Sequence, residues 1–166
     1  MPARYRRVPG RNAAVMGADD PPNQEDTMLV HELMTSPPVT APPSLPLPDA
    51  AHLMRSRGIR RLPVVDGTTL VGIVTDRDLR EALPSRVSTL SPWEATTRLA
   101  AVSVADVMRR SVLTTTPDAE ARDAASTMLS HRVGALPVID EAGQVIGIIS
   151  VTDVLREYAR PPEVSA

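Results

Sequence analysis

The chain has 166 residues, of which 42% are apolar, with a formal net charge of -2 and no cysteine. A chain of this length and apolar content can form one domain, or two small halves, with a hydrophobic core. The absence of cysteine excludes a disulfide framework and a thiolate metal site. The longest apolar runs are far shorter than the ~20 residues of a membrane helix, and the amino terminus has no apolar stretch typical of a secretory signal. We therefore expect a cytoplasmic globular protein without a membrane partner. The small charge and the 2% of aromatic residues also disfavour nucleic acid as a partner.

Residues 1–27 mix Arg, Pro, Gly and acidic residues without apolar periodicity, which predicts a disordered N-terminal tail. The arginines of this tail could touch a polyanion, but a solvated tail is the favoured interpretation. The ordered pattern begins directly after the tail, so Met28 is a second candidate for the natural start of the protein.

The rest of the chain repeats itself. At an offset of 74, residues 34–66 lie over residues 108–140, and the two segments end in LPVVD and LPVID. One extra residue in the next turn moves the offset to 75, which aligns Gly72, Thr75 and Asp78 with Gly147, Ser150 and Asp153. The repeat predicts this organisation after the tail: a first repeat at 28–83, a helical linker at 84–103, a second repeat at 104–158 and a C-terminal tail at 159–166.

Each repeat is predicted to fold in the order β-α-β-β-α. A short strand, at 39–40 or 112–115, leads through a proline into an amphipathic helix. In the first copy, Pro46 and Pro48 fit only the opening turn of this helix or the loop before it. Two strands follow in each copy, RLPVV and LVGIVT or ALPVI and VIGIIS, and their nearly continuous apolar runs indicate strands that are covered on both faces. The last helix begins at Asp76 or Val151.

The linker between the repeats carries its own helix signal. Ser91 and Glu94 have the spacing of a capping box, and Pro92 stands at the first helical position. We therefore expect a helical linker, with Trp93 packed against the repeats.

A hydroxyl residue and an aspartate follow the last strand of each repeat, Thr75 with Asp78 and Ser150 with Asp153. In one interpretation this pair is a capping box, which needs no ligand. In the other, a hydroxyl, a carboxylate and a helix N-terminus meet at the end of a buried sheet. A carboxylate accepts both hydrogen bonds of a ribose cis-diol, and free backbone N–H groups favour a nearby phosphate. Taken singly, each tetrapeptide favours the capping box.

The tandem pattern in LPVVDGTTLVGIVTDRDL and LPVIDEAGQVIGIISVTDVL resembles a pair of CBS domains, the Bateman module, over roughly residues 28–158. The ending DRDLREALPS, followed by a linker and VADVM, is also similar to the CBS pair of acetoin-utilisation regulatory proteins. Those proteins continue into an ACT domain, whereas this sequence stops soon after Tyr158. The resemblance implies an α/β (α+β) fold in which two β-α-β-β-α CBS repeats pack as a pseudo-two-fold pair.

The resemblance also implies a non-enzymatic regulatory module that binds AMP, ADP or ATP, and in some members S-adenosylmethionine, in clefts between the two repeats. Such a sensor signals to a separate, unidentified protein partner, and two modules commonly associate into a homodimer. A structural dimerisation or scaffold protein with vestigial clefts is the alternative.

By motif position, the resemblance assigns the ribose hydroxyls to Asp78 and Asp153, with Thr75 and Ser150 beside them. Backbone at Thr40–Ala41 and Thr114–Thr115, together with apolar side chains, would enclose the base. The full set of candidate ligand-binding residues is Thr40, Ala41, Ile59, Arg60, Arg61, Leu62, Pro63, Thr75, Arg77, Asp78, Thr114, Thr115, Val133, Leu136, Pro137, Ser150 and Asp153.

The two predicted sites differ in charge. Three arginines of the first repeat, Arg60, Arg61 and Arg77, are replaced in the second by Gly134, Ala135 and Thr152. A guanidinium is a fork-shaped donor suited to phosphate, so the first motif is better equipped for an anionic ligand. An arginine of one motif could also serve the other cleft. We expect one strong nucleotide site and one weak or empty site.

The sequence gives little support for catalysis or metal binding. His31, His52 and His131 have no metal-ligand spacing, and the absence of lysine excludes a Walker lysine loop. No nucleophile is paired with Asp78 or Asp153, so a nucleotide hydrolase is a distant alternative. We predict no enzymatic activity, no catalytic residue, no metal and no cofactor beyond the regulatory nucleotide.

Overall fold

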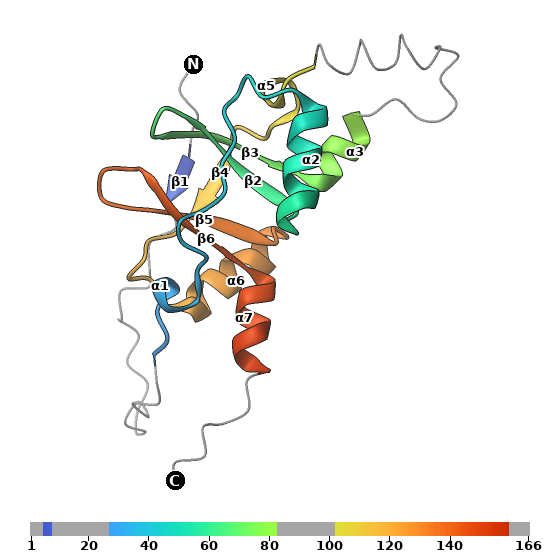
Figure 1. The fold of residues 1–166 in the computed structure, drawn as a ribbon. Helices are drawn as coiled ribbons and strands as arrows, with labels where there is room; N and C mark the ends of the chain where they lie inside the picture. Colours follow the sequence, from blue (N-terminus) through green and yellow to red (C-terminus); the bar gives the residue numbers. More distant parts are fainter. Residues whose placement is uncertain (1–4, 8–26, 83–101, 160–166) are drawn as a thin grey trace, which may run out of the picture. The chain divides into compact units, whose positions relative to one another are not determined.

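The computed structural model describes residues 5–7, 27–82 and 102–159 (Figure 1). The chain divides into two compact units. The first contains Met1–Arg6, Pro38–Val112 and Gly143–Val145, and the second contains Arg7–Pro37, Leu113–Ala142 and Ile146–Ala166. None of the helices within the described ranges is long and apolar enough to cross a membrane.

The first unit is built around an antiparallel strand pair, β2 (Arg61–Asp66) and β3 (Thr69–Thr75). Helix α2 (Leu47–Arg57) precedes the pair, and helices α3 (Asp76–Ala82) and α5 (Val104–Val107) follow it (Figure 1). Pro46 is the N-cap of α2, and Pro48 lies in its first turn, as predicted. The helix ends at Gly58, whose φ of 64° is the left-handed conformation that favours glycine.

The second unit repeats this plan with strands β5 (Ala135–Ile139) and β6 (Val145–Ser150). The helices α6 (Ala121–His131) and α7 (Val151–Tyr158) flank these strands in the chain. The short helix α1 (Val30–Leu33) corresponds to α5, and β4 (Val112–Thr114) leads toward α6. Val112 and Val145, the first residues of β4 and β6, are grouped with the first unit.

The two units exchange their opening segments relative to the predicted repeats. In the second unit the Val30 N–H donates to Ala119 O at 2.9 Å, so residues 27–37 pack on the body of the second repeat. In the first unit the Val104 N–H donates to Leu45 O at 2.8 Å, so residues 102–112 pack on the body of the first repeat. Each compact unit is therefore built from two separate stretches of the sequence.

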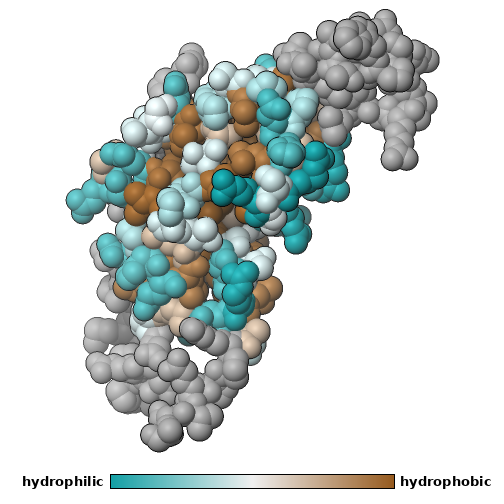
Figure 2. Space-filling model, in the orientation of Figure 1, coloured by the Kyte–Doolittle hydropathy of each residue, from teal (hydrophilic) through white to brown (hydrophobic). Residues whose placement is uncertain are grey.

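Each unit has its own hydrophobic core, to which the exchanged segments contribute. In the first core, Val104 and Met108 from the exchanged segment join Ala41, Leu47, Ala50, Met54, Leu62, Val64, Val74 and Leu79. In the second core, Val30 joins Ala124, Met128, Leu136, Val138 and Ile149. Hydrophobic side chains also reach the surface between hydrophilic ones on the face drawn in Figure 2.

Most predicted elements are present, with local differences. The strand expected at residues 39–40 is reduced to a single parallel bridge between Ala41 and Val64. A short strand, β1 (Tyr5–Arg7), lies within the stretch predicted to be a disordered tail. The predicted linker helix and Trp93 lie outside the described residues, which resume at residue 102. The bounds of the predicted repeats and tails remain predictions.

Candidate ligand site

Thr75 ends β3, and Asp78 lies in the first turn of α3. The backbone N–H and the hydroxyl of Thr75 both donate to Asp78 Oδ2, at 2.9 and 2.6 Å. The Asp78 N–H donates in turn to Thr75 Oγ1 at 3.2 Å. The capping box predicted by the spacing is therefore formed, and it fixes the orientation of the carboxylate.

The other carboxylate oxygen of Asp78 meets an arginine from a distant part of the chain. Arg109 donates to Asp78 Oδ1 from Nε at 3.4 Å and from Nη2 at 3.3 Å. The Asp78 side chain is 8% exposed, whereas the Arg109 side chain is 63% exposed. Both contacts are longer than the ~2.8 Å typical of a strong charge-assisted hydrogen bond. An exposed cation therefore covers a buried anion without a tight hydrogen bond.

Backbone hydrogen bonds place other predicted residues of the first unit along β2 and at the start of α3. The Ala41 N–H donates to Pro63 O at 3.0 Å, so Thr40 and Ala41 run parallel to β2. The Asp76 N–H donates to Arg60 O at 2.9 Å, which places Arg60 beside the start of α3. Residues that are far apart in the sequence thus lie beside β2 and the start of α3.

The apolar candidates divide into core residues and partly open ones. The side chains of Leu62 and Leu136 belong to the two hydrophobic cores and are almost fully buried. Ile59 and Val133 pack against the same cores but stay half-exposed. Ile59 and Val133 are therefore the better placed of the four to contact a base.

The three arginines of the first motif are not equivalent. Arg60 is exposed, whereas burial lowers the pKa of Arg61, and the neighbouring charge of Arg60 lowers it further. Arg77 donates from Nε to Glu81 Oε1 at 2.7 Å, and this hydrogen bond raises the pKa of Arg77. Because Arg77 is paired with Glu81 of the same helix, Arg60 and Arg61 are the better candidates to bind an anionic ligand.

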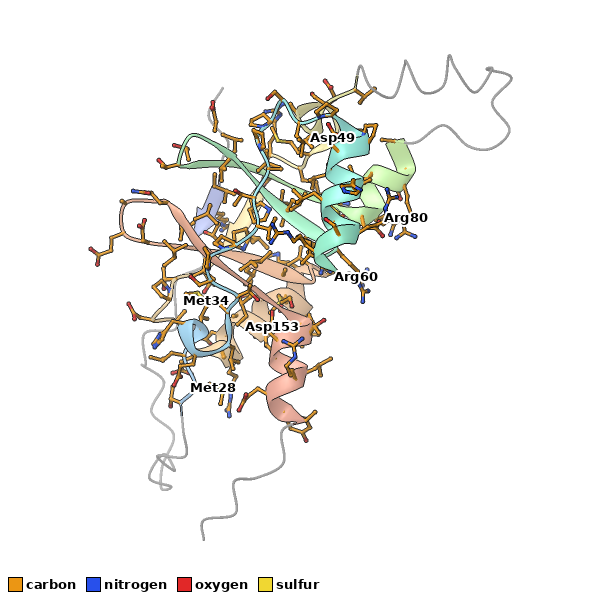
Figure 3. All side chains as sticks on the ribbon, in the orientation of Figure 1. Met28, Met34, Asp49, Arg60, Arg80 and Asp153 are labelled. Carbon is orange, nitrogen blue, oxygen red and sulfur yellow. The ribbon has the colours of Figure 1, made fainter. Side chains whose placement is uncertain are left out.

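The second unit contains the same arrangement at Ser150 and Asp153. The backbone N–H and the hydroxyl of Ser150 donate to Asp153 Oδ2 at 2.9 and 2.6 Å. Figure 3 shows Asp153 at the start of α7. Arg156, on the next turn of α7, donates from Nη1 to Asp153 Oδ1 at 3.2 Å. The arginine that pairs with Asp153 therefore belongs to the same helix as Asp153.

The rest of the second motif follows the first closely. The Thr115 N–H donates to Pro137 O at 3.1 Å, and the Val151 N–H donates to Gly134 O at 3.2 Å. Thr114, one residue before Thr115, is fully buried, and its Oγ1 has no hydrogen-bond partner within the described part of the chain. A buried hydroxyl without a partner is unusual in a native protein.

Like Arg156, Arg109 is a contact that inspection of the sequence missed. It stands at the position of Thr35 at the offset of 74, directly after the aligned Met34 and Met108. Comparing the residue after each methionine would have revealed this difference in charge. The contact with Asp78 itself depends on the exchange of residues 102–112, which the motif does not encode.

The described ranges contain no group of three His, Cys, Asp or Glu side chains that could hold a metal ion. The ring of His31 contacts Pro117 O at 3.1 Å through Nδ1.

A model of the CBS domain matches residues 30–85 and 104–160. The chain belongs to the CBS domain family. The predicted tandem pair is confirmed, and the mixed helix and strand fold matches solved CBS pairs.

Two solved CBS pairs similar to this chain contain adenosyl ligands. The CBS pair of protein MJ0100, in complex with 5-methylthioadenosine and S-adenosyl-L-methionine, is 27% identical with a TM-score of 0.68, and the match covers 80% of this chain and 97% of that chain. CBSX2 of Arabidopsis thaliana in complex with AMP is 32% identical with a TM-score of 0.66, and the match covers 78% and 95%.

The expected similarity to acetoin-utilisation proteins is also found. A putative acetoin utilization protein, AcuB of Vibrio cholerae, is 30% identical with a TM-score of 0.64, and the match covers 81% of this chain and 99% of that chain.

Among curated relatives, protein MJ1225 of Methanocaldococcus jannaschii is 33% identical over 140 residues, which are 81% of this chain and 49% of that protein. The chain spans about half of that relative and 25% of another, the L-aspartate semialdehyde sulfurtransferase of the same organism.

Proposed function

We propose that this CBS protein is a non-enzymatic sensor that binds AMP, ADP or ATP at the carboxylates of Asp78 and Asp153. S-adenosylmethionine is a further candidate, because solved relatives contain AMP, 5-methylthioadenosine or S-adenosylmethionine. The observation that carries the proposal is Asp78: its carboxylate is buried and oriented, and among the described residues an exposed arginine alone covers its second oxygen.

The binding mode follows from how the two carboxylate oxygens are used. Asp78 Oδ2 already accepts two hydrogen bonds from Thr75, so it holds the side chain in place. Asp78 Oδ1 is the acceptor left for ribose hydroxyls, with the backbone of Thr40 and the side chain of Ile59 as neighbours for the base. Arg60 and Arg61 are donors suited to phosphate.

A sensor needs more than binding. The ligand has to favour one of two geometries of the protein, and a separate partner protein has to distinguish them. We place this partner and the protein itself in the cytoplasm. The capping boxes link each aspartate to the start of the following helix. A change in the position of the bound ligand would therefore move α3 or α7.

The second candidate function is a structural dimerisation or scaffold protein with vestigial ligand sites. It is supported by an apolar stripe on α7, in which Val151, Leu155 and Tyr158 recur at helical spacing and stay exposed. The corresponding positions of α3 carry Asp76 and Arg80, which form an ion pair at 2.8 Å. An isologous homodimer would bury two copies of this stripe against each other.

Calorimetric titration tests the sensor against the scaffold. AMP, ADP, ATP and S-adenosylmethionine are titrated into the purified chain and into its Asp78→Ala and Asp153→Ala variants. Asp66→Ala is the matched control, because Asp66 is an exposed aspartate of the same unit at the far end of β2. Saturable binding that is lost in one or both site variants, and kept in the control, supports the sensor. Absence of binding at millimolar concentration, with co-purified ligand excluded, favours the scaffold.

A further inference from the structure

We infer that Arg109 makes the site of the first unit selective for adenosyl ligands that carry a phosphate. The inference rests on the proposed nucleotide function and concerns how that site distinguishes AMP from adenosine. The guanidinium of Arg109 contacts the buried Asp78, with Nη2 at 3.3 Å from Oδ1.

The backbone of Arg109 is held by two hydrogen bonds, whereas its side chain is 63% exposed and its contacts with Asp78 are long. Its N–H donates to Ile73 O at 2.9 Å, and the Ile73 N–H donates to Arg109 O at 3.0 Å. Ile73 lies on β3, two residues before Thr75, so the base of the arginine is anchored beside the candidate site. The guanidinium can therefore leave Asp78 without leaving the site.

Ribose and Arg109 compete for the same acceptor. Asp78 Oδ2 is occupied by the two hydrogen bonds from Thr75, whereas Oδ1 receives only the long contacts from Arg109 among the hydrogen bonds of the described residues. A ribose cis-diol that donates to Oδ1 would displace the guanidinium. The displaced cation then stands next to the ribose, where a 5′-phosphate provides a new anionic partner that forms stronger, fork-shaped hydrogen bonds.

A ligand without a phosphate provides no such partner. Adenosine would take Asp78 from Arg109 and leave the guanidinium without an anion, and a sulfonium ligand would add a second positive charge beside it. Arg109 therefore favours AMP over adenosine, because the ribose of either ligand displaces the guanidinium and only AMP supplies a phosphate for it to bind.

The second unit has no arginine at the position of Arg109, and Asp153 Oδ1 is covered instead by Arg156 of α7, at 3.2 Å. Thr35 occupies the corresponding place, with the same pair of backbone hydrogen bonds to Ile148, at 2.9 and 3.1 Å. Its short neutral side chain offers phosphate no charge. The two sites of one chain are thus expected to differ in selectivity, because the arginine that contacts the aspartate comes from the segment after Met108 in one unit and from α7 in the other.

The test isolates the first site in an Asp153→Ala parent and compares AMP with adenosine by calorimetry. In this parent, Arg109→Thr should lower the affinity for AMP about tenfold or more, while the affinity for adenosine stays constant or rises. Arg109→Lys should keep part of the preference for AMP. Arg110→Thr is the matched control, because Arg110 is an adjacent exposed arginine that donates to Ala105 O at 3.0 Å. Thermal unfolding shows whether each variant is folded.

The reciprocal variant tests the same idea in the second unit. In an Asp78→Ala parent, Thr35→Arg should raise the ratio of AMP to adenosine affinity. Three results would overturn the inference. Arg109→Thr could lower the affinity for AMP and for adenosine equally, or Arg110→Thr could have the same effect as Arg109→Thr. The third is an Asp153→Ala parent that no longer binds AMP. If the unmodified chain binds no adenosyl ligand, it is the proposed function that fails.

Discussion

Gly72 and Met108 lie so close that a Cβ added at Gly72 would be 2.5 Å from Met108 Sδ and 3.1 Å from Arg109 O. Gly147 has the same relationship with Met34 in the second unit. In each unit, a glycine of the last strand lets the exchanged segment lie directly on the sheet.

Gly72→Ala should therefore lower the free energy of unfolding by about 1–3 kcal/mol, the range typical of overpacking. Urea denaturation of Gly72→Ala, Met108→Ala and the double variant measures the coupling between the two positions. Because the smaller residue 108 makes room for the new methyl group, the double variant should lose less than the sum of the single losses. Strict additivity would contradict the packing argument.

Met128 and Leu129 are adjacent on α6 and form a matched pair. Met128 is fully buried in the second core, whereas Leu129 is 77% exposed. Met128→Ala should lower the free energy of unfolding by about 2–5 kcal/mol, because it leaves a cavity. Leu129→Ala should change it by less than about 0.5 kcal/mol. Similar losses for both variants in urea denaturation would contradict the assigned core.

The buried hydroxyl of Thr114 gives a prediction of opposite sign. Thr114→Val keeps the shape but removes an oxygen that has no partner in the described part of the chain. It should raise the free energy of unfolding of the ligand-free protein by about 1 kcal/mol, because a buried unpaired polar group is destabilising. Thr114→Ser keeps the hydroxyl and should be destabilising. A less stable valine variant would indicate that the hydroxyl is satisfied in solution.

Asp106 predicts a specific pH dependence. The backbone N–H of Ser103, and then its hydroxyl, donate to Asp106 Oδ2 at 2.8 Å and lower the pKa of Asp106 from its ordinary value of 3.8. A carboxylate whose pKa is lower in the folded state stabilises the fold above the unfolded-state pKa, and this stabilisation is lost as the pH falls through the folded-state pKa. Asp106→Asn should therefore be less stable than the parent at neutral pH, with a difference that shrinks below 3.8. Denaturation over a pH series checks this, and a constant difference would argue against it.

Leu155→Glu tests the proposed homodimer. Leu155 is 59% exposed in the middle of the α7 stripe, so a charge there should convert a dimer into a monomer without unfolding the unit. Light scattering after size-exclusion chromatography measures the mass. Arg122→Glu, an exposed change on α6, is the control. A mass unchanged by Leu155→Glu would place the contact elsewhere, and a monomeric parent would rule the homodimer out.

Local chemistry explains why so many elements could be predicted from the sequence. Pro46 and Pro48 mark the start of α2, and the spacing of Thr75 and Asp78 encodes a capping box that is present at 2.6 Å. These features depend on residues within one turn of each other. The missed helices α1 and α5 have only four residues each, too few to show a periodic apolar pattern.

The sequence by itself determined the repeated strands, the starts of α2, α3 and α7 and the CBS pattern, because periodicity, proline and capping act between close neighbours. Only the tertiary structure decided that residues 102–112 pack on the first repeat body and that Arg109 meets Asp78, across 31 positions of sequence. It also decided that Met108 closes over Gly72. Contacts of this kind depend on the path of the whole chain, because burial brings distant segments together wherever their surfaces fit.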